Sequence, residues 1–288
     1  MKFTKMHGLG NDYVYIDGYA YPKAIDNAED LAKYFSLSHI GIGSDGVIFV
    51  LPPKDNKNDF QMRIFNSDGS EGKMCGNGIR CVGKYVYDNG LTTSKKLRIE
   101  TLSGVKHLTL FTDEDNQVSA VQVNMGKVEI KELTLLKILG RLIEGYCVNV
   151  GNPHFVVLPG QIKATEVNDF GKAIENDACF APERTNVEFI EPAKAKDALR
   201  VRVWERGSGR TMACGTGACA SFAVANHIKM VSDNAKVILD GGELSVSYDK
   251  NKDVLMAGPA TTVFTAEITD KQLKQIARTQ QVVEKTRE

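Results

Sequence analysis

Short runs in which apolar and polar residues alternate cover much of the chain, and they predict strands. Clear examples are YVYID, VIFVL, FQMRIFN, HFVVL, LRVRVWE and ELSVSY. Period-two alternation is typical of antiparallel sheets with one covered face. Helical periodicity is confined to about residues 28–39, 77–88, 166–176, 216–229 and 270–286. The excess of strands over helices predicts an α+β fold.

The chain also repeats itself. FQMRIFNSDGSEGKMCGNGIRCVGKYV surrounds Cys75, and LRVRVWERGSGRTMACGTGACASFAVA surrounds Cys214. Further upstream, HGLGNDYVYID resembles VNVGNPHFVVL, and DGVIFVLPP resembles NVEFIEP. Asn11 precedes Cys75 by 64 residues, and Asn152 precedes Cys214 by 62. Such matched order and spacing indicate a duplicated unit.

A chain of 288 residues is long enough for two domains. We therefore predict two homologous halves, residues 1–117 and 118–265, related by a pseudo-twofold axis with an active-site cleft between them. Each half is expected to be a mostly antiparallel or mixed sheet wrapped around a central helix. The segment 266–288, with a helix starting at Asp270, is predicted to pack back on the first half. The apolar positions of this helix are Leu273, Ile276, Val282 and Val283.

Composition narrows the function classes. The chain has 36 basic and 36 acidic residues, so it lacks the basic excess of a nucleic-acid binder. Its longest purely apolar run, Val47–Leu51, is far too short to span a membrane. The start MKFTKMHGLGND lacks the apolar run of a signal peptide, so a cytoplasmic location is expected. The six cysteines show no zinc-site spacing, so no metal is expected and the thiols should stay reduced.

Two cysteines stand where a strand turns into a helix, in Cys75-Gly76-Asn77-Gly78 and Cys214-Gly215-Thr216-Gly217. The first N–H groups of a helix can hold a carboxylate, and they lower a thiol pKa from ~8.5 toward ~3.5–7.5. Two such thiols across a cleft could remove a proton from one face of a carbon and return one to the other. This layout predicts inversion of a stereocentre, although each motif alone also fits a tight turn with a buried thiol.

The motifs HGLGND, FNSDGS, MCGNGIRC, VGNPHFVV, RTNVEF, WERGSG and ACGTGAC together resemble the diaminopimelate epimerase family. The resemblance runs from Met1 to about Phe264. It implies an isomerase that needs no pyridoxal phosphate or other cofactor. It also implies interconversion of LL- and meso-2,6-diaminopimelate, for lysine and peptidoglycan precursor biosynthesis, and a homodimer.

By this resemblance Cys75 and Cys214 are the catalytic thiols, and His154 and Glu205 tune their pKa values. The positions that match the family's substrate-binding residues are Asn11, Asn66, Gly76, Asn77, Asn152, Asn186, Glu205, Arg206, Gly215 and Thr216. The chain departs from the family at Gly46, where many members have Gln. One side-chain contact to the substrate is then missing or supplied by water.

Three other interpretations fit the residues. A proline-racemase-like enzyme would carry similar cysteine motifs, but the Glu205-Arg206 pair and the asparagines favour a longer, two-headed substrate. A non-catalytic amino-acid-binding protein would need the amides but not both thiols. A redox switch would join Cys75 and Cys214 in an inactivating disulfide.

Overall fold

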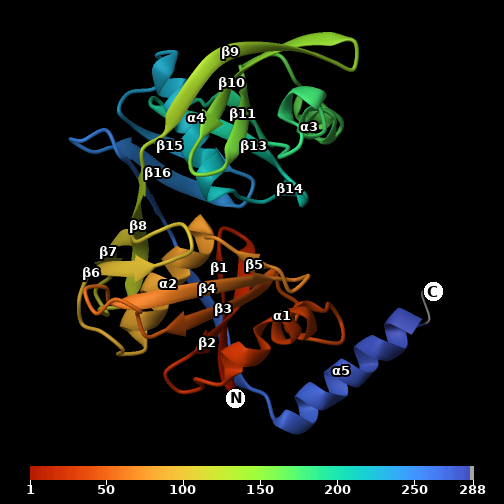
Figure 1. The fold of residues 1–288 in the computed structure, drawn as a ribbon. Helices are drawn as coiled ribbons and strands as arrows, with labels where there is room; N and C mark the ends of the chain where they lie inside the picture. Colours follow the sequence, from red (N-terminus) through yellow and green to blue (C-terminus); the bar gives the residue numbers. More distant parts are fainter. Residues whose placement is uncertain (286–288) are drawn as a thin grey trace. The chain divides into compact units, whose positions relative to one another are not determined.

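A computed structural model describes the backbone of residues 1–285 (Figure 1). It forms two compact units: Met1–Val121 together with the segment from Pro259, and Gln122–Gly258. The sequence division placed residues 259–265 in the second half. In the structure they belong with the first unit, because strand β18 (Thr261–Glu267) pairs antiparallel with β1 (Lys2–Gly8).

The first unit is a mixed sheet built from neighbouring strands. β1 pairs antiparallel with β2 (Asn11–Asp17), and β2 pairs parallel with β3 (Gly46–Leu51). β3 pairs antiparallel with β4 (Phe60–Asn66), and β4 pairs parallel with β6 (Lys96–Glu100). β7 (Lys106–Thr112) follows β6 antiparallel, and the short β5 (Glu71–Gly72) lies against β4.

The helices of the first unit lie on both faces of this sheet. α2 (Gly76–Asp88) packs against β1, β2 and β7, and most of its residues are buried. α1 (Ala28–Ser36), preceded by a 3₁₀ turn at Ala24–Asn27, covers β3 and β4 from the other face. α5 (Asp270–Lys285) places Leu273 and Ile276 against the core around Phe35. The side chains of Val282 and Val283 lie outside the described residues.

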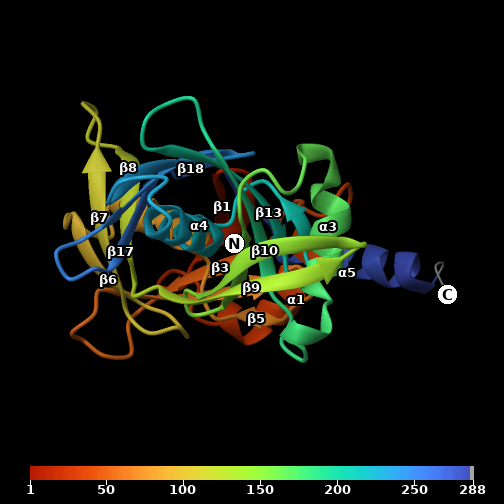
Figure 2. The same ribbon diagram turned by 90° about the horizontal axis from the view of Figure 1, so that it is seen from above.

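The second unit repeats this plan, and its strands β9 and β10 are seen side by side in Figure 2. β9 (Glu129–Ile138), β10 (Arg141–Asn149) and β11 (Pro153–Val157) pair antiparallel in turn, and β11 pairs parallel with β12 (Asn186–Pro192). β13 (Ala198–Glu205) lies between β12, antiparallel, and β15 (Asn234–Leu239), parallel. β16 (Gly242–Tyr248) and β17 (Val254–Gly258) follow antiparallel, and β14 (Gly209–Thr211) lies against β13.

The sheet of the second unit wraps around α4 (Gly215–His227), which touches strands from β10 to β17. Ten of the helix's residues, among them Phe222 and Val224, are buried. A helix that is apolar on every side is typical of a fully enclosed position. α3 (Val167–Glu175) covers the outer face of β12 and β13, and 3₁₀ turns lie at Ala164–Glu166 and Ala178–Phe180.

The strand registers confirm the internal repeat. Val47 pairs with Phe65 between β3 and β4, and Val187 pairs with Trp204 between β12 and β13. These two pairs occupy equivalent places in the two units, so the residues next to them along each strand are equivalent as well. Gly46 is therefore the counterpart of Asn186, and Asn66 is the counterpart of Glu205.

The α+β prediction is confirmed, and all five helices lie where periodicity predicts them. Strand β8 (Val118–Gly126) carries the chain from the first unit into the second. Strand β9 was not predicted, because most of its side chains are exposed, among them Leu133 and Leu135. None of the described helices is long and apolar enough to cross a membrane.

Candidate active site

Cys75 is the residue that caps helix α2. Its backbone is extended, at φ −131° and ψ 121°, and its Sγ accepts a hydrogen bond of 3.3 Å from the N–H of Gly78. This is the usual N-cap arrangement with sulfur in place of a side-chain oxygen. The thiol donates to Oδ1 of Asn11 at 3.2 Å, which joins the helix start to the start of β2.

The amides of the first unit gather around this thiol. Asn77 Nδ2 lies 3.4 Å from Asn11 Oδ1, and its own Oδ1 accepts 2.9 Å from the fully buried Arg80 guanidinium. Arg80 also donates to the carbonyl of Gly76 at 3.1 Å. Asn11 Nδ2 donates to Asp45 Oδ2 at 2.7 Å. The predicted residues Asn11, Cys75, Gly76 and Asn77 thus form one connected cluster.

Two other predicted positions of the first unit lie on β3 and β4. Asn66 is joined to Gly46 through the strand register, and its Nδ2 donates to Ser70 Oγ at 3.1 Å. A Cβ at Gly46 would lie only 2.1 Å from the carbonyl oxygen of Phe65. The backbone here therefore requires the glycine that distinguishes this chain from the family members with Gln, because no side chain fits at this position without moving β4.

Cys214 caps helix α4 in the same way. Its backbone is extended, at φ −119° and ψ 118°, and its Sγ accepts 3.3 Å from the N–H of Gly217. The sulfur also lies 3.4 Å from Thr216 Oγ1. Unlike Cys75, which is partly exposed, Cys214 is buried. The two repeats therefore share the capping geometry but differ in solvent access.

A hydrogen-bond chain runs from Thr216 into the interior of the second unit. Asn152 Nδ2 donates to Thr216 Oγ1 at 3.4 Å, and Asn152 Oδ1 lies 3.0 Å from His154 Nε2. His154 Nδ1 lies 2.7 Å from Glu188 Oε1, and neither side chain is exposed to solvent. The predicted residues Cys214, Thr216, Asn152 and His154 are thus connected, and the chain ends at a carboxylate that the sequence did not single out.

Glu205 and Arg206 lie at the end of β13. Glu205 accepts 2.5 Å from Thr211 Oγ1 and a hydrogen bond from the Cys214 thiol. Burial raises the pKa of Glu205, and the Glu188 carboxylate raises it further, while these two hydrogen bonds and His154 lower it. The N–H of Arg206 donates to Asn186 Oδ1 at 3.0 Å, and its exposed guanidinium donates to the carbonyl of Glu183.

The expectation that the helix start lowers the thiol pKa is wrong for Cys214. Burial raises the pKa of this thiol well above its ordinary value, and the Glu205 and Glu188 carboxylates raise it further. The contacts with Thr216 and the Gly217 N–H oppose these effects but are smaller. Two nearby carboxylates and the loss of water outweigh the helix terminus, so Cys214 holds its proton.

Sequence reasoning missed several residues of the two clusters, among them Glu188, Asp45 and Tyr13. Glu188 stands at a buried position of a strand, and an acidic residue amid the apolar run of NVEFI was the available signal. Asp45 receives hydrogen bonds from both Asn11 and the N–H of Asp12. Tyr13 is the counterpart of His154, and burial and the nearby Cys75 raise its pKa well above the ordinary value.

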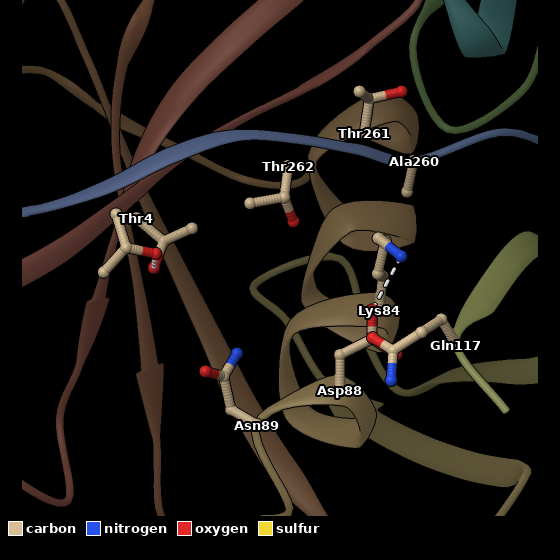
Figure 3. A pocket seen from close by; sticks show the side chains of 9 residues that line it. Thr4, Lys84, Asp88, Asn89, Gln117, Ala260, Thr261 and Thr262 are labelled. Atoms are coloured by element: carbon tan, nitrogen blue, oxygen red, sulfur yellow. Dashed lines mark hydrogen bonds and ion pairs between the residues drawn. The ribbon is translucent and has the colours of Figure 1, made fainter. Parts of the chain in front are cut away.

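A separate hollow of about 500 Å³ lies between α2 and β18 of the first unit (Figure 3). Its lining includes Lys84, Asp88 and several threonines, and none of the predicted site residues. Lys84 Nζ is 2.6 Å from Asp88 Oδ2 and donates to the carbonyl of Val118 at 2.7 Å. The charged groups that line this hollow, Lys84 and Asp88, are therefore already paired with each other. Among the side chains that the structure describes, residues 1–279, no three His, Cys, Asp or Glu gather as metal ligands.

Comparison with known proteins gives matches along most of the chain. The profile of the family described as diaminopimelate epimerase matches residues 3–131 and 146–263. Three proteins named diaminopimelate epimerase are similar over nearly the whole chain. The one from Agathobacter rectalis is 43% identical, covering 93% of this chain and 99% of its own. Those from Methanococcus maripaludis and Parabacteroides distasonis are 44% and 45% identical, covering 93% and 92% of this chain and 99% and 96% of their own.

Solved structures share the fold at low identity. A probable proline racemase from Agrobacterium radiobacter has a TM-score of 0.70 at 18% identity, with 93% of both chains covered. A PhzF-family phenazine biosynthesis protein from Bacillus anthracis has a TM-score of 0.70 at 17% identity, covering 93% of this chain and 99% of its own. These likenesses concern the fold alone. With the profile match and relatives above 40% identity, the chain belongs to the diaminopimelate epimerase family.

Proposed function

We propose that this chain is a cofactor-independent epimerase that interconverts LL- and meso-2,6-diaminopimelate. The observation that carries the proposal is the duplicated helix cap, in which the sulfurs of Cys75 and Cys214 each accept a hydrogen bond from a backbone N–H at the start of a buried helix. Asn11 contacts the Cys75 thiol directly, and Asn152 is linked to Cys214 through Thr216. The family and its named relatives supply the substrate.

The reaction needs one thiolate and one thiol. The Sγ of Cys75, as thiolate, takes the proton from Cα and becomes a thiol. The carbanion then takes the proton of Cys214 on its other face, which leaves Cys214 as thiolate. Proton number and charge balance, and the reverse reaction exchanges the two roles. Cys214 suits the acid role because its raised pKa keeps it protonated.

An amino-acid α-proton is only weakly acidic, so the developing negative charge must be stabilised. The N–H groups at the starts of α2 and α4 are fixed donors for the reacting carboxylate, at Gly76-Asn77 and Gly215-Thr216. A preorganised donor of this kind is worth ~3–4 kcal/mol when water is excluded. The substrate's Cα must be reached by both sulfurs, and exclusion of water from the reacting centre would strengthen these donors.

The distal end of the substrate carries a second carboxylate and ammonium. Arg206 suits the carboxylate, because a guanidinium binds carboxylates in bidentate fashion. Asn186 orders the backbone at Arg206, and Asn11, Asn66 and Asn152 supply further amide groups. Glu205 contacts the Cys214 thiol, so its place in this scheme is beside the reacting centre as well as near the substrate ammonium.

Replacement of each thiol tests the proposal. Cys75→Ala and Cys214→Ala should each abolish epimerisation, while Cys179→Ala, at an exposed cysteine outside both clusters, should leave it unchanged. Diaminopimelate in D₂O should gain deuterium at Cα only with the intact pair. Turnover that survived in either single variant would overturn the two-thiol mechanism, and a wild-type protein that epimerises only proline would favour the racemase alternative.

The remaining alternatives have their own readouts. A binding protein would retain diaminopimelate affinity without turnover in the wild type. A redox switch would make activity fall with mild oxidant and return with reductant.

We further propose a cytoplasmic homodimer. The exposed Val263 and Phe264 of β18 are apolar side chains that a second copy could cover. Light scattering after gel filtration should give twice the chain mass, and Phe264→Lys should lower it.

A further inference from the structure

Glu188 is the unexplained acidic group of the second unit. It lies on β12 with no solvent exposure, and its Oε2 has no hydrogen-bond partner among the described residues. Burying a carboxylate is costly unless it is paired, and even a buried pair is often no more stable than apolar residues of similar size. A residue kept at such a cost needs a reason other than packing.

The first unit shows what packing alone would require. The counterpart of Glu188 is Ile48, and the counterpart of His154 is Tyr13. A Cβ on Gly78 would lie 2.6 Å from Ile48 Cδ1, and one on Gly217 would lie 2.5 Å from Glu188 Oε1. Each glycine therefore leaves room beneath its helix start for the residue on the sheet. In the first unit an apolar side chain occupies this space, so packing alone does not require an acidic residue at position 188.

The hydrogen-bond directions assign Glu188 a task. Because Asn152 donates through Nδ2 to Thr216, its Oδ1 faces the ring of His154 and must accept a hydrogen bond from Nε2–H. The second ring nitrogen, Nδ1, lies 2.7 Å from Glu188 Oε1, and one proton between these two atoms forms the hydrogen bond. Without Glu188, the ring could rotate or move its proton to Nδ1, and Nε2 would no longer serve Asn152.

We propose that Glu188 is a positioning residue that holds His154 with its Nε2–H directed at Asn152 and so orients Thr216 at the helix start beside Cys214. This inference rests on the proposed function. The titratable groups that face Glu188 are His154 from β11, Glu205 from β13 and Cys214 from α4.

Three variants of the full chain separate positioning from packing. Glu188→Ile copies the first unit, so it should fold, yet its kcat/KM should fall roughly 10²-fold. Glu188→Gln can donate an amide N–H to Nδ1 and preserve the Nε2–H form, so it should recover most of that loss. Glu191→Gln, on the same strand but half-buried and bound to the N–H of Gly160, is the matched control and should behave as wild type.

NMR of the His154 ring nitrogens gives a measurement that a purely packing role of Glu188 would leave unchanged. The wild type should show a hydrogen on His154 Nε2 throughout the pH range of activity, and so should Glu188→Gln, whereas Glu188→Ile should show a mixture of ring forms. Full activity in a folded Glu188→Ile variant, or an unprotonated Nε2 in the wild type, would overturn the proposal. Should Glu188→Ile not fold, the wild-type spectrum and the Glu188→Gln kinetics still decide. A wild type without epimerase activity would refute the proposed function and leave the NMR test of Glu188 intact.

Discussion

At the scale of single residues, the two repeats share a backbone but differ in acid–base chemistry. Tyr13 and Ile48 stand in the first unit where His154 and Glu188 stand in the second. Both cysteines cap a helix, but Cys75 is partly exposed, whereas Cys214 is buried near two carboxylates. A single duplicated motif has thus become an asymmetric pair.

The raised pKa of Cys214 predicts slow alkylation. Only the thiolate reacts with iodoacetamide, so at pH 8 Cys214 should react at least roughly tenfold more slowly than a cysteine of ordinary pKa ~8.5 in a peptide. The rate should rise as pH increases above 9. Mass spectrometry of timed digests gives the rate for this site. Rapid labelling of Cys214 at pH 7 would show that the thiolate is favoured instead.

Glu205→Gln should lower activity and raise stability at neutral pH. Burial raises the folded-state pKa of Glu205, so the folded protein holds this proton more tightly than the unfolded chain does. Stability is then fully present below the unfolded pKa of ~4.3 and declines as pH rises through the folded value. The Gln variant escapes that decline, while kcat should fall roughly 10²-fold or more.

Thermal melts at pH 4 and pH 8 check the sign. The variant should exceed the wild type in Tm at pH 8, and the gap should shrink at pH 4. Glu243→Gln, at an exposed position of β16, serves as the control. A gap of equal size at both pH values would show that Glu205 does not titrate as inferred.

Part of this cluster could be predicted from the sequence and part could not. The Cys-Gly motifs can be recognised in the sequence, because the glycines and the internal repeat locate the two helix starts. Glu188 and Asp45 belong to no such motif, because their roles depend on hydrogen-bond partners far away in the chain. Glu188 meets His154 across a parallel strand pair, a contact that periodicity does not encode.

At the scale of elements, α3 holds the turn that carries Glu205 and Arg206. Glu175, near the end of α3, accepts 2.7 Å from Trp204 Nε1 and 2.9 Å from the N–H of Gly207. These two donors lie on either side of Glu205 and Arg206. A third hydrogen bond of 2.8 Å comes from Arg184. One buried carboxylate thus fixes the backbone on both sides of the Glu-Arg pair.

Glu175→Gln should therefore loosen the site without removing any group that touches the substrate. An amide keeps one acceptor but loses the charge, so we expect a loss of about 1–3 kcal/mol in stability. KM for diaminopimelate should rise more than kcat falls, because Arg206 is displaced. Denaturant titration and steady-state kinetics measure the two effects. Glu166→Gln, at an exposed pair with Arg141, should change neither, and an unaltered KM in Glu175→Gln would refute the role.

The elements themselves were largely predictable because their patterns are local. All five helices begin within one residue of the sequence estimate. β9 escaped because leucines stand on both of its faces: Leu133 and Leu135 are exposed while Leu136 and Ile138 are buried, so apolar and polar residues do not alternate. The assignment of β18 to the first unit also escaped. Its partner β1 lies at the other end of the chain, so only tertiary structure reveals the pairing.

At the scale of the whole molecule, the two units differ in how the chain builds them. The second is one continuous segment, Gln122–Gly258, and the first needs both ends of the chain. The core of the first unit includes Phe3 from β1 and Ile268 from beyond β18, with Leu273 and Ile276 of α5 packed against it. The second unit has its own core around Phe155 and Ile174.

This difference predicts unequal fates for the two fragments. Residues 122–258 retain every strand from β9 to β17 and the whole Glu188–His154–Asn152 chain, so the fragment should fold and unfold cooperatively. Residues 1–121 lose β18 and α5, which exposes the edge of β1 and part of the Phe3 cluster, so this fragment should aggregate or remain molten. Circular dichroism melts and proton NMR dispersion distinguish the outcomes. The folded fragment should keep the His154 ring signals of the full chain and yet show no epimerisation, because it lacks Cys75. A folded 1–121 beside an unfolded 122–258 would reverse the inference, and turnover by 122–258 alone would show that one thiol suffices.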